Sequence, residues 1–431
     1  MGEKLMNELK TISQAAADTA AACACSTKGL PSVEEAMERL RALVQPIRDV
    51  ESVPVFDLED RILACDVQTV CDLPLFDNAA MDGYALALDS LEGQGPWQLP
   101  VFDRIAAGQP GDTPLPAGMV ARIFTGAPLP KGADLVIPQE QVVRAGDVIT
   151  IHDRPAPGAH VRRSGSDMQK GHPLLSEGTR LTANRIAALA GAGIGAAKVY
   201  RRPRVALMMS GDEIRDAGAE LSAGEIWDVN TPMISALVTA AGADIVARVQ
   251  LSDTPLEIAS AFARVAGQVD LIITSGGVSV GEEDHLHQSF IRAGGQHAFS
   301  GVAMKPGKPV SAGQIEGALW LGLPGNPVAA FVGWHLFGNG ILSALGHHPS
   351  ETPTQAAVLG GQLEHKVGRR EFRPVAVMGR DASGRPVIDP GVPVRSASLS
   401  QLLAADGMID IAAETTTGQV GETVRFLPFV S

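Results

Sequence analysis

The sequence is poor in aromatic residues and lacks the excess of positive charge that nucleic-acid-binding proteins use. Only 4% of its 431 residues are aromatic and two are tyrosine, so we expect no aromatic platform for stacking single-stranded bases. The formal net charge of −13 also argues against nucleic acid as a partner. A few positioned cations and backbone N–H groups still bind small anions, whatever the total charge. Any anion site must therefore be local.

Cysteine and long apolar runs are also scarce. Cys23, Cys25, Cys65 and Cys71 lack the C-x-x-C spacing of a zinc site, and we expect no disulfide framework. We find no apolar run near the ~20 residues that a membrane-spanning helix needs, and the alanine-rich residues 15–25 lack the leucine content of a signal peptide. These absences predict a soluble, cytoplasmic protein without membrane contact.

The length and the change of pattern along the chain indicate about three or four domains. Ser32 and Glu35 form a capping-box pattern before a helix that presents Ala36, Leu40 and Leu43 on one face. Short β-branched runs then dominate before residue 165 and again after about residue 350. We expect a weakly ordered extension at 1–30, an elongated linking domain I at 31–54 and 166–203, a β-rich domain II at 55–165, an α/β domain III at 204–347, and a C-terminal, β-barrel-like domain IV at 348–431.

Strands and helices alternate between residues 204 and 345, which predicts a parallel, doubly wound sheet. The expected strands are 205–209, 244–251, 269–274 and 318–323, and the expected helices are 232–241, 255–266, 282–293 and 327–345. In such sheets ligands bind beyond the carboxyl ends of the strands. The residues that follow each strand are therefore the candidates for a site.

The segment 269–285 joins a buried-strand pattern to a glycine-rich turn and an acidic helix start. Gly276 and Gly277 let the backbone approach a ligand closely, and Ser275 and Ser279 supply hydroxyls beside N–H groups that suit a phosphate. Asp284 then places a carboxylate where a divalent ion could bridge to that phosphate. A tight strand-to-helix connection without any ligand explains the turn about equally well when it is taken alone.

Other strand ends are polar and acidic as well. Ser210, Gly211, Asp212 and Glu213 follow the first strand, and Asp253 follows the second. Each of these carboxylates is more often a helix cap than a ligand. Together with Asp284 they favour a divalent cation bound to a phosphate, with Asp253 and Asp284 as the metal ligands.

Two further connections are framed by proline. Lys305 and Lys308 alternate with prolines and Gly307, a rigid cationic turn that suits an oxyanion better than a solvated basic loop. Pro324, Gly325, Asn326 and Pro327 precede the last helix and leave N–H groups at its start. A plain helix start explains this second motif equally well.

These motifs together resemble the molybdopterin molybdenumtransferase family, the bacterial MoeA type related to the E domain of gephyrin. The resemblance covers about residues 31–431 and rests on residues 77–85, 122–127, 210–213, 269–285, 304–309 and 323–327. It implies insertion of molybdate into adenylylated molybdopterin, with magnesium-dependent hydrolysis of the adenylate and release of AMP. It also implies a homodimer with a shared active cleft, and contact with other proteins of cofactor synthesis.

The resemblance also implies roles for individual residues. The catalytic set that it implies is Asp82, Thr125, Asp167, Glu213, Asp253 and Asp284. Lys305 and Lys308 match the molybdate-binding pair, and Arg369 and Ser396 match C-terminal residues near the oxyanion. Without the resemblance, Asp82 as a turn residue and Thr125 as a strand residue are equally good readings.

Two other functions fit parts of the pattern. The adenylyltransferase of the same pathway resembles residues 204–347, but the additional domains and residues 77–85 argue against it. A non-catalytic molybdopterin-binding scaffold is the third hypothesis, and the intact acidic and lysine positions argue against it. The sequence does not decide between molybdate and tungstate, because these oxyanions have nearly the same size and charge.

Overall fold

The chain divides into two compact units. The computed structural model describes residues 29–252, 254–276, 285–348, 354–391 and 399–429. Residues 50–199 form one unit, and the chain before and after them forms the other. We call the first the inserted unit and the second the α/β unit, and each is described by itself.

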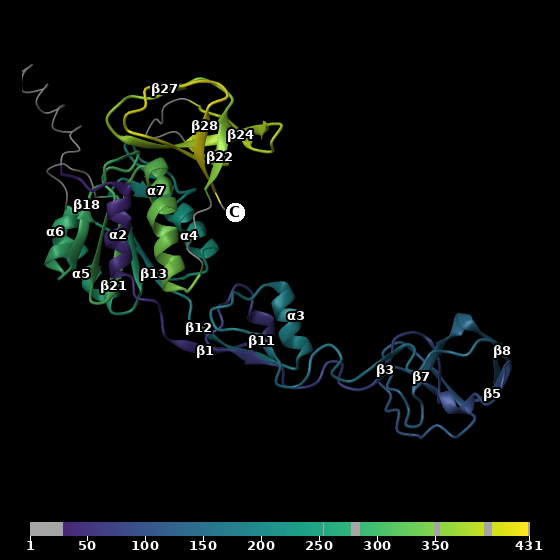
Figure 1. Ribbon diagram of the computed structural model, residues 1–431. Coiled ribbons are helices and arrows are strands. Elements are labelled where there is room, and N and C mark those ends of the chain that lie inside the picture. The colour runs from purple at the N-terminus through teal and green to yellow at the C-terminus, as the bar shows by residue number, and fades with distance from the viewer. Residues whose placement is uncertain (1–28, 253, 277–284, 349–353, 392–398, 430–431) are drawn as a thin grey trace, which may run out of the picture. The chain divides into compact units, whose positions relative to one another are not determined.

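The α/β unit is built on a six-stranded mixed sheet with strand order β16-β13-β17-β21-β20-β18 (Figure 1). Its strands are β13 (Arg204–Ser210), β16 (Asp244–Leu251), β17 (Leu271–Ser275), β18 (Gln296–Ser300), β20 (Ser311–Ile315) and β21 (Ala318–Leu323). The first four strands in the sheet are parallel, as the alternating pattern predicts. Strand β20 pairs antiparallel with β21, and β18 pairs antiparallel with β20. The sequence did not predict these two strands.

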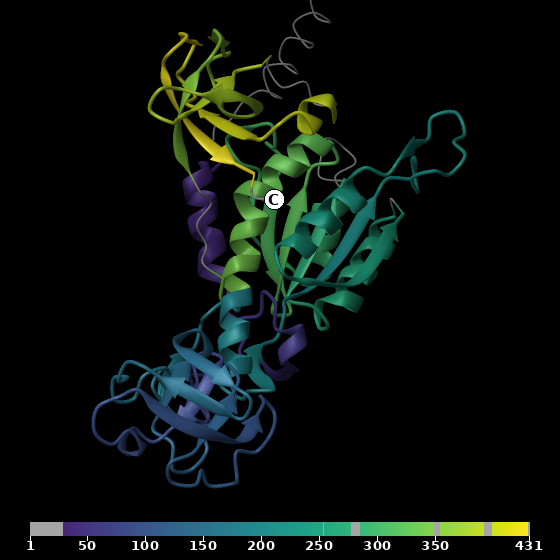
Figure 2. The same cartoon turned by 90° about the vertical axis from the view of Figure 1, so that its right-hand side faces the viewer.

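Alternate residues of each central strand face opposite sides of this sheet, because successive side chains of a strand point in opposite directions. Val205 and Leu207 belong to the core on one face, and Ala206 and Met208 belong to the core on the other. The first face is covered by α2 (Val33–Leu43), α4 (Asn230–Ala240) and the helical segment Pro327–Leu345. The second is covered by α5 (Pro255–Ala266) and α6 (His285–Arg292). Figure 2 shows these helices on the two sides of the sheet. The carboxyl ends of the strands therefore lie between two layers of helices.

Helix α2 begins as its sequence predicts. The Ser32 hydroxyl accepts a hydrogen bond from the Glu35 backbone at 3.1 Å, and the Glu35 carboxylate accepts one from the Ser32 backbone at 2.8 Å. This reciprocal arrangement satisfies two N–H groups at the start of the helix. The helix buries Ala36 and Leu40 against the α/β core, so its apolar face is the predicted one.

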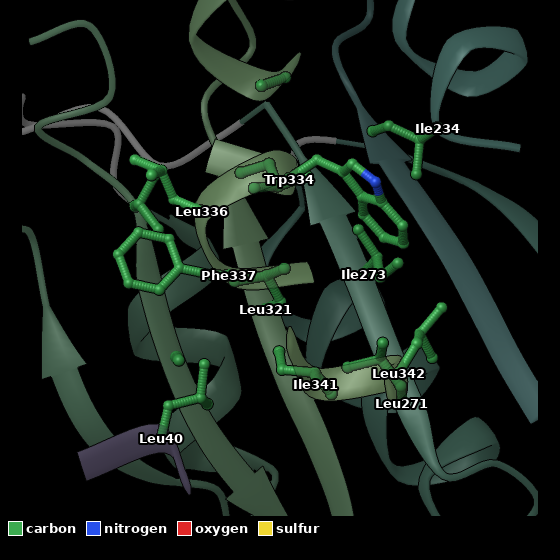
Figure 3. Packing of buried hydrophobic residues seen from close by; sticks show 14 of the residues in the cluster. Leu40, Ile234, Leu271, Ile273, Leu321, Trp334, Leu336, Phe337, Ile341 and Leu342 are labelled. Atoms are coloured by element: carbon green, nitrogen blue, oxygen red, sulfur yellow. The ribbon is translucent and has the colours of Figure 1, made fainter. Parts of the chain in front are cut away.

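The segment Pro327–Leu345 is long and apolar enough to cross a membrane, with a mean hydropathy of 1.4. It meets this test by length and composition only, and His335 and Asn339 interrupt its apolar residues. It is 72% buried inside the fold, as a core helix is. It comprises α7 (Pro327–Gly333), the π-helical turn η4 (Trp334–Gly338) and α8 (Asn339–Leu345), and Figure 3 shows Trp334 and Phe337 packed among side chains of the sheet.

The C-terminal part of the α/β unit carries a second six-stranded sheet, with strand order β19-β24-β25-β22-β28-β26. Its strands are β19 (Met304–Lys305), β22 (Gln355–Leu359), β24 (Arg370–Arg380), β25 (Pro386–Asp389), β26 (Gly407–Ile411) and β28 (Thr423–Pro428). Strands β23 (Leu363–Glu364) and β27 (Thr417–Gly418) pair beside it, and α9 (Leu399–Leu403) precedes β26. Strand β19 comes from the predicted domain III, so residues of both predicted domains share one sheet.

The inserted unit is mainly β-structure, as predicted. Its six-stranded sheet has the order β7-β4-β6-β5-β9-β8. The strands are β4 (Gly83–Leu86), β5 (Trp97–Ile105), β6 (Val120–Ile123), β7 (Leu135–Pro138), β8 (Val142–Ala145) and β9 (Val148–Ile151). Near α3 (Ala183–Gly191) are the strand pairs β1 (Val50–Pro54) with β12 (Ala196–Tyr200) and β2 (Val67–Gln68) with β11 (Pro173–Leu175). The pair of β3 (Asn78–Ala79) with β10 (Val161–Arg162) packs instead with the six-stranded sheet.

Candidate functional site

Buried polar groups converge at the carboxyl ends of β13, β17 and β21. The amide nitrogen Nδ2 of Asn230, at the start of α4, donates to Ser275 Oγ and to the Gly325 carbonyl, both at 2.8 Å. Ser275 Oγ in turn donates to the Pro324 carbonyl at 3.0 Å. Asn230 is 8% exposed and Ser275 is 2% exposed. Hydrogen bonds therefore hold three neighbouring connections in one arrangement, at the edge of the sheet where ligands bind in α/β folds.

Gly276 makes this arrangement possible. Its φ of +88° lies in the left-handed region, and a Cβ added there would lie 2.5 Å from the Ser210 carbonyl oxygen. A Cβ on Gly325 would lie 3.3 Å from the Cα of Gly276. Only glycine at position 276 permits this close passage of backbone past backbone. We call Ser210, Asn230, Ser275, Gly276 and Gly325 the strand-end cluster.

Two oxygen atoms of the strand-end cluster are available to a ligand. Among the described residues, neither Ser210 Oγ nor Asn230 Oδ1 has a hydrogen-bond partner, although both are buried. A buried polar atom without a partner costs free energy unless a ligand or water satisfies it. The Ser210 hydroxyl can donate to an anion, and both atoms are hard oxygen donors of the kind that magnesium prefers.

The predicted lysine turn lies at the junction with the C-terminal sheet. We call residues 305–309 the lysine loop; the Gly307 carbonyl accepts from Val310 N at 3.0 Å, and the Lys308 carbonyl accepts from Val302 N at 2.9 Å. The Lys305 ammonium forms an ion pair with Glu371 at 3.0 Å. The Lys305 side chain is 29% exposed, so it reaches solvent while remaining tied to the C-terminal sheet.

The other motifs around this sheet edge have different structural roles. Asn326 caps α7, because its side-chain oxygen accepts from Ala329 N at 3.2 Å. Glu213 is exposed. It lies near the start of residues 211–228, which we call the arm, and its carbonyl accepts a hydrogen bond from Ile226 N at 2.9 Å. Gly211, with φ +139°, begins this arm. Pro327 is the first residue of α7, the position at which a missing N–H is tolerated.

The structure brings together two of the three predicted residues of the inserted unit, Asp82 and Thr125. Thr125 donates to Asp82 Oδ1 twice, from its backbone N at 2.8 Å and from Oγ1 at 2.7 Å. These hydrogen bonds lower the pKa of the Asp82 carboxyl, with a smaller contribution from Arg122. Asp167, an exposed residue, donates from its backbone N to the Leu73 carbonyl at 2.9 Å.

The three motifs of the inserted unit are joined by a backbone hydrogen bond and by hydrogen bonds to the Asp77 carboxylate. Gly126 N donates to the Ala79 carbonyl at 2.8 Å, and Asp77 accepts from Arg163 Nη1 at 2.6 Å and from Ser164 N at 2.8 Å. Residues 77–85, 122–127 and 162–167 are therefore held next to one another. They carry the exposed Asp82–Thr125 pair.

Several predicted site residues lie outside the described part of the chain, namely Asp253, Gly277, Ser279, Asp284 and Ser396. These include both predicted metal ligands. Within the described ranges, no group of three or more His, Cys, Asp or Glu side chains is placed to hold a metal ion. Arg369 is described; it is partly buried immediately before β24, and its carbonyl lies 3.2 Å from His365 Nε2.

Sequence reasoning missed three residues of this region. Asn230 was assigned to no role, although it joins Ser275 to Gly325. Glu371 and Arg373 were not considered, although both are essentially buried and ion-paired. Their signal in the sequence is the spacing of two charged residues, 371 and 373, two positions apart in β24, which places both on one face of the strand.

The fold and the strand-end cluster define a multidomain protein whose α/β domain has a candidate ligand site at the carboxyl ends of its strands. Residues 31–193 match the family described as the MoeA N-terminal region, domains I and II. Residues 207–344 match a probable molybdopterin binding domain, and residues 356–429 match the MoeA C-terminal region, domain IV.

Relatives match along nearly the whole chain. Molybdopterin molybdenumtransferase 2 of Mycobacterium tuberculosis is 35% identical over 91% of this chain and 98% of its own length. The molybdopterin molybdenumtransferase of Haemophilus influenzae is 37% identical over 73% of this chain and 78% of its own. A crystal structure of the molybdopterin biosynthesis MoeA protein from Pyrococcus horikoshii covers 93% of this chain and 100% of its own, with 29% identity and a TM-score of 0.78. The chain belongs to the molybdopterin molybdenumtransferase family.

Proposed function

We propose that this chain is a transferase of molybdenum cofactor biosynthesis that inserts molybdate into molybdopterin. The observation that carries the proposal is the strand-end cluster, a buried set of donors and unpartnered oxygens within the segment that matches the molybdopterin-binding family. The full-length similarity to molybdenumtransferases supports transfer of the metal. The similarity extends through the N- and C-terminal regions. An adenylyltransferase would need only the segment that resembles it, residues 204–347.

In the proposed reaction, adenylylated molybdopterin binds with a phosphate at the Ser210 hydroxyl and the Gly276 backbone, while Ser275, whose hydroxyl donates to the Pro324 carbonyl, holds the turn in place. Water cleaves the phosphoanhydride, which releases AMP and leaves the phosphate on molybdopterin. The dithiol then forms two sulfur–molybdenum bonds, and its two protons leave with one molybdate oxygen as water. Lys305 and Lys308 hold the tetrahedral oxyanion by charge-assisted hydrogen bonds. The lysine loop and the strand-end cluster belong to the same unit, which allows one fold to bind both substrates.

We propose that Asp253 and Asp284, which in the sequence follow β16 and precede α6, bind the magnesium ion. The unpartnered oxygens of the strand-end cluster, Ser210 Oγ and Asn230 Oδ1, suit a hard cation, and the Ser210 hydroxyl can also donate to a phosphate. When bound, the ion would neutralise charge on the phosphate oxygens and so favour hydrolysis. Glu213 would contribute a further carboxylate from the arm, and Arg369 and Ser396 would contribute from the C-terminal domain.

We further propose that the protein is a cytoplasmic homodimer and that Asp82, Thr125 and Asp167 act in the cleft of the second copy. The exposure of the Asp82–Thr125 pair supports this, because such a pair needs a covering surface to act in a water-poor site. The five-part domain division given above, and contact with other proteins of cofactor synthesis, belong to the same proposal.

The test is an assay of purified full-length protein with adenylylated molybdopterin, magnesium, and molybdate or tungstate in turn. We expect AMP release that depends on magnesium, together with formation of the metal-containing cofactor. ATP-dependent adenylylation of molybdopterin by this chain alone would instead identify an adenylyltransferase. Tight molybdopterin binding without AMP release would identify a scaffold.

A further inference from the structure

Glu371 is buried and forms ion pairs with two cationic side chains, Arg373 and Lys305, although one would neutralise its charge. Its side chain is fully buried, and Arg373 Nε donates to Oε1 at 2.9 Å. Arg373 is 1% exposed and is itself fixed by the carbonyls of Glu364 at 2.8 Å and Pro390 at 3.2 Å. This rigid pair already neutralises the carboxylate, so the bond from Lys305 to Oε2 at 3.0 Å needs a different explanation.

The charges of Glu371, Arg373 and Lys305 together leave Lys305 able to bind an anion. Burial raises the pKa of the Glu371 carboxyl, but the hydrogen bonds and charges of Arg373 and then Lys305 outweigh burial and hold the pKa below its ordinary value. Glu371 is therefore ionised, and one carboxylate with two cations, Arg373 and Lys305, gives a net charge of +1 (−1 + 1 + 1); His365, whose Nε2 lies 3.6 Å from Glu371 Oε2, adds no negative charge. Without Arg373, the carboxylate would cancel the charge of the lysine and repel an incoming oxyanion.

The register of the sheet explains why Glu371 meets this particular lysine. Strand β19 runs parallel to β24, with Met304 opposite Arg370 and Lys305 opposite Glu371. The lysine loop thus begins as an edge strand of the C-terminal sheet. The ammonium group has three N–H donors; Glu371 accepts from one, which leaves two for a ligand at the partly exposed tip.

We propose that Glu371 is a positioning residue of the oxyanion site, which holds the ammonium of Lys305 in place while Arg373 cancels the charge of the carboxylate. This inference rests on the proposed function of Lys305. It assigns the C-terminal domain a definite part in that function, because the carboxylate that orients the lysine comes from β24. Glu371 acts through Lys305 and does not itself touch the substrate.

The central experiment is a double-mutant cycle on the full-length protein, measured by the KM for molybdate in the AMP-release assay. Glu371→Gln raises this KM roughly tenfold, because one charge-assisted hydrogen bond orients the lysine, and leaves the binding of molybdopterin unchanged. In a Lys305→Met background, Glu371→Gln has no further effect on KM. An equal rise in both backgrounds shows a purely structural role and overturns the proposal.

A second readout does not depend on turnover. Chemical acetylation of lysines, followed by mass spectrometry, measures how firmly the Lys305 amine is held. Glu371→Gln increases the labelling rate of Lys305 several-fold and leaves that of the exposed Lys366 unchanged. An unchanged rate at Lys305 overturns the positioning role, even if the chain has no molybdate-dependent activity. An increased rate without any such activity supports the positioning contact and rejects the proposed function.

Glu371→Gln leaves Arg373 buried without its carboxylate, which endangers folding. The double variant Glu371→Gln/Arg373→Met removes both charges and is the matched control. It shows the same rise in KM and in Lys305 labelling if Glu371 acts on Lys305. A wild-type labelling rate in this folded variant contradicts the proposal.

Discussion

The strand-end cluster and the Asp82–Thr125 pair hold their polar groups in opposite ways. The cluster is buried, with side chains fixed to backbone carbonyls and with close contacts between main chains. The pair is exposed, and Thr125 supplies both of the hydrogen bonds to Asp82 described above. A buried arrangement is part of what keeps the protein folded, whereas an exposed one contributes little to stability. Substitutions in the two regions should therefore separate stability from activity.

Gly276→Ala should have the largest effect. The new Cβ would lie 2.5 Å from the Ser210 carbonyl oxygen at a φ of +88°, so the turn must move. We expect a loss of about 1–3 kcal/mol in the free energy of unfolding from backbone strain alone, with more from the clash, and loss of molybdopterin binding. Denaturant unfolding and equilibrium binding measure both quantities.

Gly294→Ala is the matched control for this substitution. Gly294 also has a positive φ, +96°, but nothing lies within 4 Å of its added Cβ. It should lose stability by strain and keep molybdopterin binding. Similar binding losses in the two variants would show that the close approach at Gly276 has no special role.

Asn230→Ala should come next. It removes the donor to Ser275 Oγ and to the Gly325 carbonyl and leaves a buried acceptor unsatisfied, which costs about 1–3 kcal/mol. Calorimetric unfolding would show the lower stability, and molybdopterin titration would show weaker binding. A variant with wild-type stability and affinity would mean that these hydrogen bonds do not organise the cluster.

Acid should weaken the α/β unit through His335 in the π-helical turn. Burial lowers the pKa of His335 from 6.5 to about 4, so in the folded state the ring stays neutral while the unfolded chain takes up a proton. The stability from this group is complete above pH 6.5 and declines as the pH falls toward 4; at pH 5 the loss is about 2 kcal/mol. Urea unfolding at pH 7 and pH 5 should show a smaller acid loss in His335→Phe than in the wild type. Equal losses would contradict a neutral buried ring.

Thr125→Val and Asp82→Asn should have the smallest effects on stability. Both sites are surface positions, so we expect changes within about 0.5 kcal/mol, with activity reduced roughly tenfold or more because a charge or a donor at the proposed cleft is lost. Parallel unfolding and AMP-release measurements test this. Loss of stability in proportion to activity would place the pair among the structural contacts of the inserted unit.

The sequence predicted the parallel part of the α/β sheet because each strand is a short β-branched run between helical patterns. It did not reveal the edge strand β18 or its neighbour β20, because Gln296, His297 and Gln314 give these two strands a polar appearance. The pattern of α2 showed which face is apolar but not that the face packs on the α/β core. Amphipathicity identifies a buried side and leaves its partner open.

The candidate site divides in the same way. Local motifs revealed Ser275, Gly276 and Lys305, because glycine, hydroxyl and proline-framed lysine patterns carry their chemistry in a few adjacent residues. Glu371 escaped notice because its partner Lys305 is 66 residues away. A buried ion pair of that separation becomes evident only when the strand register is known.

The most direct test of the central claim follows molybdenum itself. The full-length wild type and the Gly276→Ala and Gly294→Ala variants are incubated with adenylylated molybdopterin, magnesium and molybdate, and molybdenum in the isolated pterin product is measured together with AMP. We predict that product molybdenum rises in step with AMP for the wild type and Gly294→Ala, and that neither appears for Gly276→Ala. Release of AMP by the wild type with no molybdenum in the pterin would contradict the account.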